Sequence, residues 1–407
     1  MKVNAPRLLK HLDQLAQIGR IPGDGVCRLA FSEEDKAGRD YVEHRMRALG
    51  MQVSIDSIGN ILGIRPGQSD GPVVLTGSHT DTVATGGRFD GSLGVLAALE
   101  VIERLNEEQI TTEKPVGVVS FVNEEGVRFM PDMLGSLFLR GDLSVEEVRD
   151  IVGIDGTTIG QNLDKTGYAG QDDFRGIDIA HFIELHIEQG PWLETENKTI
   201  GVVDRVQGIR WLEFTFDGIA NHAGATPMFM RKDAGLVAGA LTCAVRELVD
   251  EIGGDQRATV GAITLKPNLI NVIARQATVT VDLRNPDPAM LSKAEAHIVQ
   301  KAHDIAAQEG VGVSVRKLAD VVPVTFNQQS VAAIERAANA LGLSHQKMIS
   351  GAAHDAQILA GKYPAAMIFV PSKNGISHNV EEYTSPEHIE AGANVLLHTI
   401  TALAGAG

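Results

Sequence analysis

The sequence predicts an α/β protein whose main domain is interrupted by a second, smaller domain. Short apolar runs alternate with helical patterns at both ends of the chain, which is the element order of layered α/β folds. Between them, residues 210–326 have the order β-α-β-β-α-β, a split βαβ unit that can fold as a ferredoxin-like domain. The 407 residues are enough for two or three domains of ordinary size.

The flanking regions predict a sheet with helices on both faces, an α/β/α arrangement. The first helices are expected at residues 7–18 and 32–49, and the second of these begins with Ser32 as a candidate cap before three acidic residues. Further along, the patterns predict helices at 91–105 and 330–341 and buried strands at 73–76, 116–122, 179–187 and 365–370.

The interrupting segment has its own regular pattern. Its strands are expected at residues 211–216, 258–265, 277–283 and 312–318, and its helices at 231–251 and 288–309. We therefore predict one domain made of residues 1–209 and 327–407, and a second made of residues 210–326.

Composition argues against several classes of function. A net charge of −16 repels phosphate backbones, so nucleic-acid binding is not expected. There is no apolar run long enough to cross a membrane. With Cys27 and Cys243 as the two cysteines and no signal-peptide core at the start, a reducing cytoplasm is the expected location. The P-loop, GxGxxG, GxSxG and HExxH motifs are absent.

Side chains that bind metals stand at the ends of the predicted strands. His79, Glu125, His186 and His378 each follow or end one of them, and Asp90 precedes the helix at 91–105. Because ligands of open α/β sheets collect beyond the carboxyl ends of the strands, we expect these five side chains in one crevice. Each alone could be a surface histidine, a helix cap or a solvated acid. Their joint placement predicts a metal site.

The number of candidates indicates two ions. A catalytic zinc needs three protein ligands, and five are available if Asp90 bridges. One ion would then have His79, Asp90 and His186, and the other Asp90, Glu125 and His378, with the ions about 3.5–4 Å apart around a shared water. Nitrogen and oxygen ligands suit zinc, and also manganese, cobalt and nickel.

Two carboxylates beside these ligands are further candidates. Asp81 lies two residues after His79, where it could hold the imidazole from behind or form a turn. Glu124 precedes Glu125 and is not needed as a ligand, so it is the candidate general base for a metal-activated water.

The charge of such a site predicts an anionic substrate. Two dications exceed the charge of two carboxylates and a hydroxide, which leaves a locally positive pocket. Arg210 and Arg284 could complete it, because arginine binds carboxylates bidentately. Each of them could equally be an ordinary surface arginine.

Six motifs resemble those of a known family: GSHTDT at 77–82, GGRFDG at 86–91, EEG at 124–126, ELHIEQG at 184–190, NHAG at 221–224 and GISH at 375–378. They resemble the hydantoinase/carbamoylase amidases of the dinuclear-metal M20 peptidase clan, in order and across nearly the whole chain. The most similar subgroup is the N-carbamoyl-L-amino-acid hydrolases. Allantoate amidohydrolases and β-ureidopropionases share most of the motifs.

The resemblance implies roles for individual residues. The five candidate ligands match the metal positions, and Glu124 matches the catalytic base. His222 matches a residue that polarises the scissile carbonyl from the inserted domain, of its own subunit or of a partner. Matches to substrate-binding positions are Asn271 and Arg284, which would hold a carboxylate, and Arg210 and Gln189. The sequence departs from the family at Ala353, where glycine is more frequent, and at Val127, where serine is frequent; both bear on the substrate side chain.

The resemblance implies a metal-dependent amidohydrolase that converts N-carbamoyl-L-amino acids to the amino acid, ammonia and carbon dioxide. Residues 1–209 with 327–407 would be its catalytic domain. Residues 210–326 would be a lid through which homodimers form, and a sheet with one uncovered face and free edges favours such pairing. Allantoate amidohydrolase, β-ureidopropionase, dipeptidase or aminoacylase activity, or a catalytically silent binding module, are the alternatives.

Overall fold

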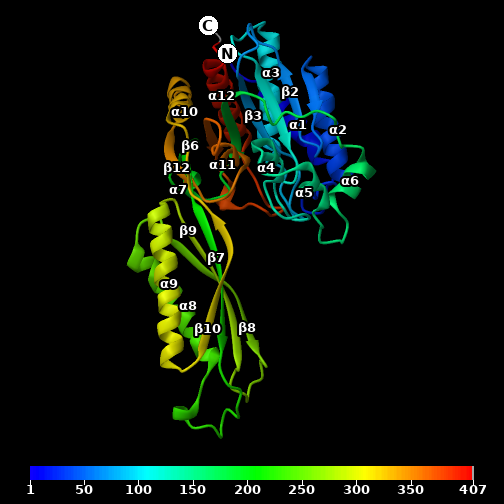
Figure 1. Cartoon of the computed structure of the whole chain (residues 1–407). Coiled ribbons are helices and arrows are strands. Elements are labelled where there is room, and N and C mark those ends of the chain that lie inside the picture. The colour runs from blue at the N-terminus through cyan, green and yellow to red at the C-terminus, as the bar shows by residue number, and fades with distance from the viewer. Residues whose placement is uncertain (406–407) are drawn as a thin grey trace. The chain divides into compact units, whose positions relative to one another are not determined.

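The structure, a computed structural model, describes residues 1–405 and contains two compact units (Figure 1). The flanking unit comprises Met1–Asp204 and the chain from Thr325 onward, and the inserted unit is Arg205–Val324. A large mixed sheet belongs to the first and a separate antiparallel sheet to the second. The predicted α/β fold class is confirmed.

The larger sheet places the four predicted strands side by side. Among the described residues it has nine strands in the order β1-β2-β4-β3-β5-β13-β6-β11, with β12 paired to β6. β4, β3, β5 and β13 run parallel, and antiparallel strands flank them. The carboxyl ends of these parallel strands therefore meet at one edge of the sheet. The bounds are β1 Gln52–Ile55, β2 Ile61–Arg65, β3 Val73–His79, β4 Val116–Phe121, β5 Ile179–Ile187, β6 Ile200–Val206, β11 Val324–Thr325, β12 His345–Ser350 and β13 Ala365–Val370.

Helices cover both faces of this sheet. Alternate side chains of β5 show it, because successive side chains of a strand point to opposite faces. Leu185 lies beside Gly392 of α12, whereas Glu184 accepts a hydrogen bond from Ala356 N of α11. The helices are α1 Ala5–Ala16, α2 Glu33–Ala48, α3 Ser92–Glu107, α4 Leu134–Arg140, α5 Val145–Asp150, α6 Ile159–Thr166, α7 Trp192–Thr195, α10 Gln328–Ala340, α11 Asp355–Leu359 and α12 Pro386–Leu403.

The expected helix cap is present at α2. The Ser32 side chain accepts a hydrogen bond from Asp35 N, and acidic residues fill the first turn, where they interact favourably with the helix dipole. α3 is buried along most of its length, as its apolar sequence requires. None of the described helices is both long and apolar enough to cross a bilayer.

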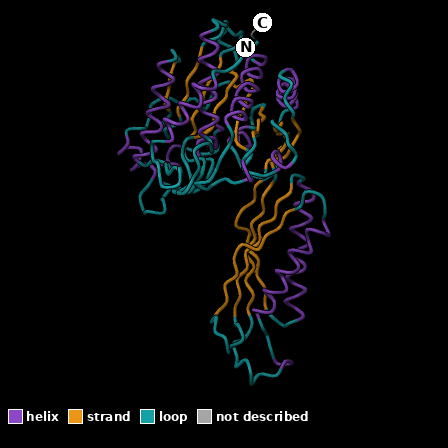
Figure 2. Tube along the Cα trace, turned by 180° about the vertical axis from the view of Figure 1, so that it is seen from behind, coloured by secondary structure: helices purple, strands orange, loops and turns teal. Residues whose placement is uncertain are grey.

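The inserted unit is a four-stranded antiparallel sheet with two long helices on one face (Figure 2). Its strand order is β10-β7-β9-β8. Leu212, Phe214 and Phe216 of β7 point into the core under the helices, and the alternate residue Trp211 points to the other face, where it is exposed. The bounds are β7 Gly208–Asp217, α8 Ala234–Ile252, β8 Arg257–Lys266, β9 Gln276–Asn285, α9 Pro288–Gln308 and β10 Gly312–Val321.

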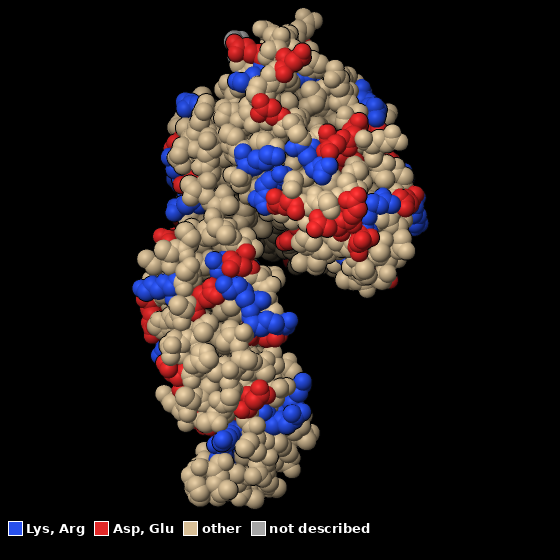
Figure 3. All heavy atoms as spheres, viewed as in Figure 1, with Lys and Arg blue, Asp and Glu red and all other residues tan. Residues whose placement is uncertain are grey.

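Charged side chains are interspersed on the face of the molecule drawn in Figure 3. Basic and acidic groups alternate there over both units, so the net charge of −16 does not form one acidic patch on this face.

Gly77 is a position where the fold depends on glycine. Its φ is +145°, and a Cβ added there would lie 1.9 Å from Val119 O of the neighbouring strand. We expect Gly77→Ala to lower the free energy of unfolding by at least about 2 kcal/mol, because the backbone strain adds to the clash. Urea unfolding followed by circular dichroism measures this.

Gly176→Ala is the matched control, since a Cβ there would meet nothing within 4 Å. It should change stability by no more than about 0.5 kcal/mol. Equal unfolding midpoints for the two variants would contradict the role assigned to Gly77.

Candidate metal centre

The ends of the parallel strands bring the candidate ligands together. His79 is the last residue of β3, and His186 lies one residue before the end of β5. Glu125 follows β4 and His378 follows β13. Asp90 stands just before α3 and reaches all of these groups.

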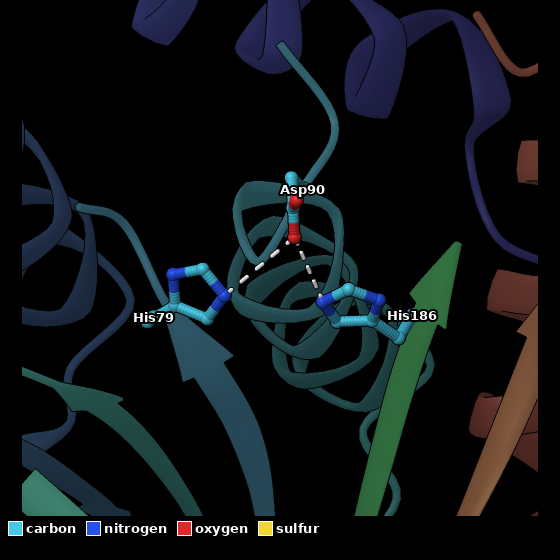
Figure 4. A group of neighbouring side chains, drawn as sticks. All are labelled: His79, Asp90 and His186. Carbon is cyan, nitrogen blue, oxygen red and sulfur yellow. Dashed lines mark ion pairs between the residues drawn. The ribbon is translucent and has the colours of Figure 1, made fainter. Parts of the chain in front are cut away.

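The first group consists of two imidazoles facing one oxygen of Asp90 (Figure 4). His186 Nε2 lies 3.1 Å and His79 Nε2 lies 3.7 Å from Asp90 Oδ1. All three side chains are buried. Their ligand atoms are close enough together to hold one metal ion.

The second group uses the other oxygen of the same carboxylate. His378 Nε2 lies 3.4 Å from Asp90 Oδ2 and 3.4 Å from Glu125 Oε2. Asp90 thus offers one oxygen to each group, which is the arrangement of a bridging carboxylate. The structure brings together the residues of both triads that the ligand count predicts; that they bind metal stays a prediction.

Backbone carbonyls orient the two buried imidazoles. His79 Nδ1 lies 3.0 Å from Asp81 O, and His186 Nδ1 lies 2.9 Å from Ile187 O. A carbonyl oxygen only accepts hydrogen bonds, so each ring carries a proton on Nδ1, and Nε2 is the atom that faces Asp90 and binds a metal once it is unprotonated. That neutral form is the one that binds metals. Gly91 leaves the space open, because a Cβ there would lie 2.4 Å from His79 Nε2.

Asp81 supports the site through both its main chain and its side chain. Its carbonyl holds His79, and its carboxylate accepts hydrogen bonds from Glu124 N at 3.3 Å and Glu125 N at 3.2 Å. The side chain thus positions the segment after β4 and touches the ring of His79 less closely, with Oδ1 at 3.8 Å from Nδ1.

The donor atoms fit divalent ions. Glu125 Oε1 and Gln189 Oε1 are buried without a hydrogen-bond partner among the described residues, which leaves their lone pairs available. Gln189 Nε2 donates to Asp90 Oδ2 at 2.9 Å and so orients the bridging carboxylate. Imidazole nitrogens and carboxylate oxygens together suit zinc, manganese, cobalt and nickel.

The pKa values of the carboxyl groups in the site are shifted in opposite directions. Burial, and then repulsion by neighbouring carboxylates, raises the pKa of Glu124 and Glu125 well above the usual value. Burial alone would also raise the pKa of Asp90, but hydrogen bonds with His186 and His378 bring it well below its usual value. Two dications bound among these carboxylates would relieve their mutual repulsion.

Glu382 holds the Asp90 loop in place and was not predicted. Its carboxylate accepts hydrogen bonds from Phe89 N at 3.0 Å, from Asp90 N at 3.2 Å and from the Ser377 hydroxyl at 3.0 Å. It therefore links the Asp90 loop to the segment of His378. The sequence shows only an acidic pair at 381–382, which gives no sign of this role.

A second set of unpredicted residues lies behind His186. The ring of His354 packs edge-on against it with centroids 4.6 Å apart. Glu184 accepts hydrogen bonds from the Ser78 hydroxyl and from Ala356 N. The family resemblance had singled out the neighbouring Ala353, but the strand pattern of residues 179–187 did not single out Glu184.

The inserted unit holds His222 and Asn271 in adjacent loops. His222 pairs with Val272 in an isolated bridge, and Ala223 N donates to Asn271 O. His222 Nδ1 accepts hydrogen bonds from Gly224 N and Ala225 N, each at 3.1 Å. Nδ1 is therefore an acceptor, which leaves Nε2 as the hydrogen-bond donor of the ring.

The two candidate arginines of the inserted unit point to opposite faces of its sheet. Arg284 lies on the exposed face, where its guanidinium contacts Asp282 with Nη2 at 2.9 Å from Oδ2. Arg210 lies on the helix-covered side, paired with Glu295 of α9 and with Asp320. Its predicted substrate contact remains untested.

Comparison with known proteins identifies the family. Residues 75–402 match the model of peptidase family M20/M25/M40. The chain is 38% identical to an N-carbamoyl-L-amino-acid amidohydrolase of Rhizobium meliloti, over 98% of this chain and 96% of that protein. The crystal structure of a hydantoinase/carbamoylase family amidase from Burkholderia multivorans superposes with a TM-score of 0.95 at 44% identity, covering 99% of this chain and 98% of that one. The chain belongs to the hydantoinase/carbamoylase amidases of family M20.

The resemblance drawn from the six motifs is thereby confirmed. Within this family of hydrolases the relatives differ in activity: an allantoate amidohydrolase of Bacillus subtilis is 34% identical over 97% of this chain and 96% of its own length. Family membership therefore makes the chain a hydrolase and leaves the substrate to be decided by the site.

Metal removal should make the stability of this M20 amidase depend on pH. Burial raises the pKa of Glu382 to about 7. Burial lowers that of His186, but Asp90 raises it to about 9, and the pKa values of Glu124 and Glu125 lie well above normal. Above pH 6.5 the folded state therefore keeps protons that the unfolded state has lost. Stability then falls as pH rises. The buried His79, with a pKa lowered to about 4, acts in the opposite sense only below pH 6.5.

We expect the melting temperature of the chelated protein to fall between pH 6.5 and 8.5. Added zinc should raise it by an amount that grows with pH, because metal ligands must be deprotonated. In Asp90→Asn the zinc effect should disappear. A pH-independent effect of zinc, or one retained in Asp90→Asn, would contradict a metal centre at these residues.

Proposed function

We propose that this chain is a metal-dependent amidohydrolase that cleaves the carbamoyl C–N bond of N-carbamoyl-L-amino acids. The observation that carries the proposal is the Asp90 carboxylate shared by two groups of ligands, with the unligated carboxyl of Glu124 beside them. The relative from Rhizobium meliloti, named for this activity, supports the choice of substrate.

The ligand triads would hold two divalent ions. His79, Asp90 and His186 would hold one, and Asp90, Glu125 and His378 the other. When bound, such ions lower the pKa of water and polarise a carbonyl oxygen. The metal itself is not determined by these ligands, and zinc is the first to test.

Glu124 is proposed as the general base and acid. Its Oε2 lies 3.4 Å from His79 Nε2, at the edge of the first triad. A carboxyl with a raised pKa is suited both to accept a proton from the attacking water and to return it to the departing nitrogen. Asp81 positions Glu124 through the backbone hydrogen bond described above.

The inserted unit is proposed to supply the remaining contacts. His222 Nε2–H would donate to the oxygen of the scissile carbonyl and stabilise the negative charge that develops there. Arg284 and Asn271 would hold the α-carboxylate, with Gln189 and Arg210 as further contacts. Asn271 precedes the start of β9 and Arg284 lies near its end, about 26 Å further along at about 3.3 Å per residue. The two would therefore reach one carboxylate from different subunits of a homodimer formed through the inserted unit.

The reaction is a hydrolysis and needs no oxidant or reductant. Water adds its oxygen to the carbamoyl carbon, the bond to the amino-acid nitrogen breaks, and that nitrogen takes the proton from Glu124. The released carbamic acid gives ammonia and carbon dioxide. One substrate and one water thus give the amino acid, ammonia and carbon dioxide.

Glu124→Gln tests the base. The amide keeps the shape but cannot accept the proton, so kcat should fall by at least about a thousandfold. Metal content and affinity for the substrate should remain. Turnover assays, elemental analysis and calorimetric titration measure these quantities, and Glu146→Gln, at an exposed helix position, should behave as the wild type. Substantial turnover in Glu124→Gln would overturn the assignment.

A substrate panel separates the proposal from its alternatives. With zinc, manganese, cobalt or nickel added, N-carbamoyl-L-amino acids should release ammonia and free amino acid faster than allantoate or β-ureidopropionate do, and dipeptides should not be cleaved. A preference for allantoate would favour the activity of the Bacillus subtilis relative. Fewer than about two metal ions per chain and no turnover would indicate a silent binding module.

A further inference from the structure

The exposed face of the inserted sheet has a hollow of about 290 Å³. Trp211 of β7 and Leu318 of β10 form its apolar walls, and both are about two-fifths exposed, at 41% and 42%. Large apolar side chains that are exposed in a concave surface often indicate a binding site. The other lining residues are Gly261, Thr280, Val281 and Asp282.

Two β-bulges shape this hollow. Gly261 is the extra residue on β8, and Leu318 is the extra residue on β10. Both bulges lie within two residues of the level at which Trp211 pairs with Asp282. A bulge turns side chains in a new direction, and here one bulge brings Leu318 to the hollow. The other contributes a glycine, where a Cβ would lie 3.3 Å from Thr280 Oγ1, so a longer side chain would fill the space.

The negative charge of Asp282, which lines one end of the hollow, is neutralised by Arg284. Asp282 contacts the Arg284 guanidinium with Nε at 3.1 Å and Nη2 at 2.9 Å. The remaining walls are apolar apart from the Thr280 hydroxyl, which accepts a hydrogen bond from Ala262 N. The hollow therefore suits an uncharged apolar group.

The Arg284 guanidinium lies at the rim of this hollow. Its Nη2 is 2.9 Å from Oδ2 of Asp282, which is one of the lining residues. A carboxylate bound by Arg284 would therefore bring the side chain attached to it within reach of the hollow. The volume suits one side chain and is below that of most complete ligand pockets, about 300–1,000 Å³.

From this geometry we propose that the hollow is the specificity pocket for the substrate side chain and takes a bulky apolar group, with an aromatic ring packed on Trp211. This inference rests on the proposed function, in which Arg284 holds the α-carboxylate. The preferred substrates are then N-carbamoyl derivatives of phenylalanine, tryptophan and leucine rather than of glycine or alanine.

Kinetics on a side-chain series test the pocket in the full-length, metal-loaded enzyme. We expect kcat/KM for N-carbamoyl-L-phenylalanine to exceed that for N-carbamoylglycine by at least about tenfold. Gly261→Val, which fills the hollow, and Trp211→Ala, which removes its wall, should each lower the value for the phenylalanine derivative by at least about tenfold and leave that for the glycine derivative within about threefold. Thr264→Val, on the same strand but outside the hollow, is the control.

Fluorescence gives a second readout that does not need turnover. The chain has two tryptophans, so Trp192→Phe leaves Trp211 as the single reporter. In Trp192→Phe combined with Glu124→Gln, N-carbamoyl-L-phenylalanine should change the emission with saturation, and N-carbamoylglycine should not. Gly261→Val added to this background should abolish the response.

The two proposals fail in different ways. If ureido acids are hydrolysed but the side-chain preference is unchanged in Gly261→Val and Trp211→Ala, the pocket assignment is wrong and the proposed function stands. If no ureido acid is hydrolysed but the fluorescence response to the phenylalanine derivative saturates, the proposed function is wrong. The hollow is then still shown to bind an apolar group. Absence of that response overturns the pocket.

Discussion

The position of one carboxylate, that of Asp90, governs the whole site. Its two oxygens face different groups, with His79 and His186 on one side and His378 on the other. The loop before α3 is held by its backbone: Gly91 has a positive φ of 60°, and Glu382 accepts a hydrogen bond from Asp90 N. The parallel strands then deliver the imidazoles to a carboxylate that is already in place.

The site concentrates negative charge that the surrounding protein does not neutralise. Burial raises the pKa of Glu124, Glu125 and Asp355, and neighbouring carboxylates, Asp81 among them, raise it further. A buried arrangement of this kind is stable only with protons or cations present. Metal ions bound at these residues would therefore also stabilise the fold. The raised pKa of the proposed base Glu124 comes first from burial and then from the same neighbouring carboxylates.

The two faces of the sheet in the inserted unit carry different kinds of side chain. Leu212, Phe214 and Phe216 build the core beneath the helices, while Trp211 and Arg284 face outward. The fold is shared with relatives over nearly the full chain, so side chains rather than architecture must distinguish their substrates. In the proposed pocket of this chain, Gly261 and Leu318 are the two residues that the bulges place at the hollow.

The sequence by itself determined the α/β fold class, the parallel strands and the residues at their ends, because strand patterns are local and the carboxyl ends of parallel strands must meet at one edge. It did not predict the short strands β1 and β2 or the helices α4–α6, whose local patterns are weak and whose formation depends on packing. Only the tertiary structure decided which distant groups support the ligands. Glu382 and Phe89 are 293 positions apart, and Arg210 faces the helices because strand pairing, rather than residue type, sets the direction of its side chain.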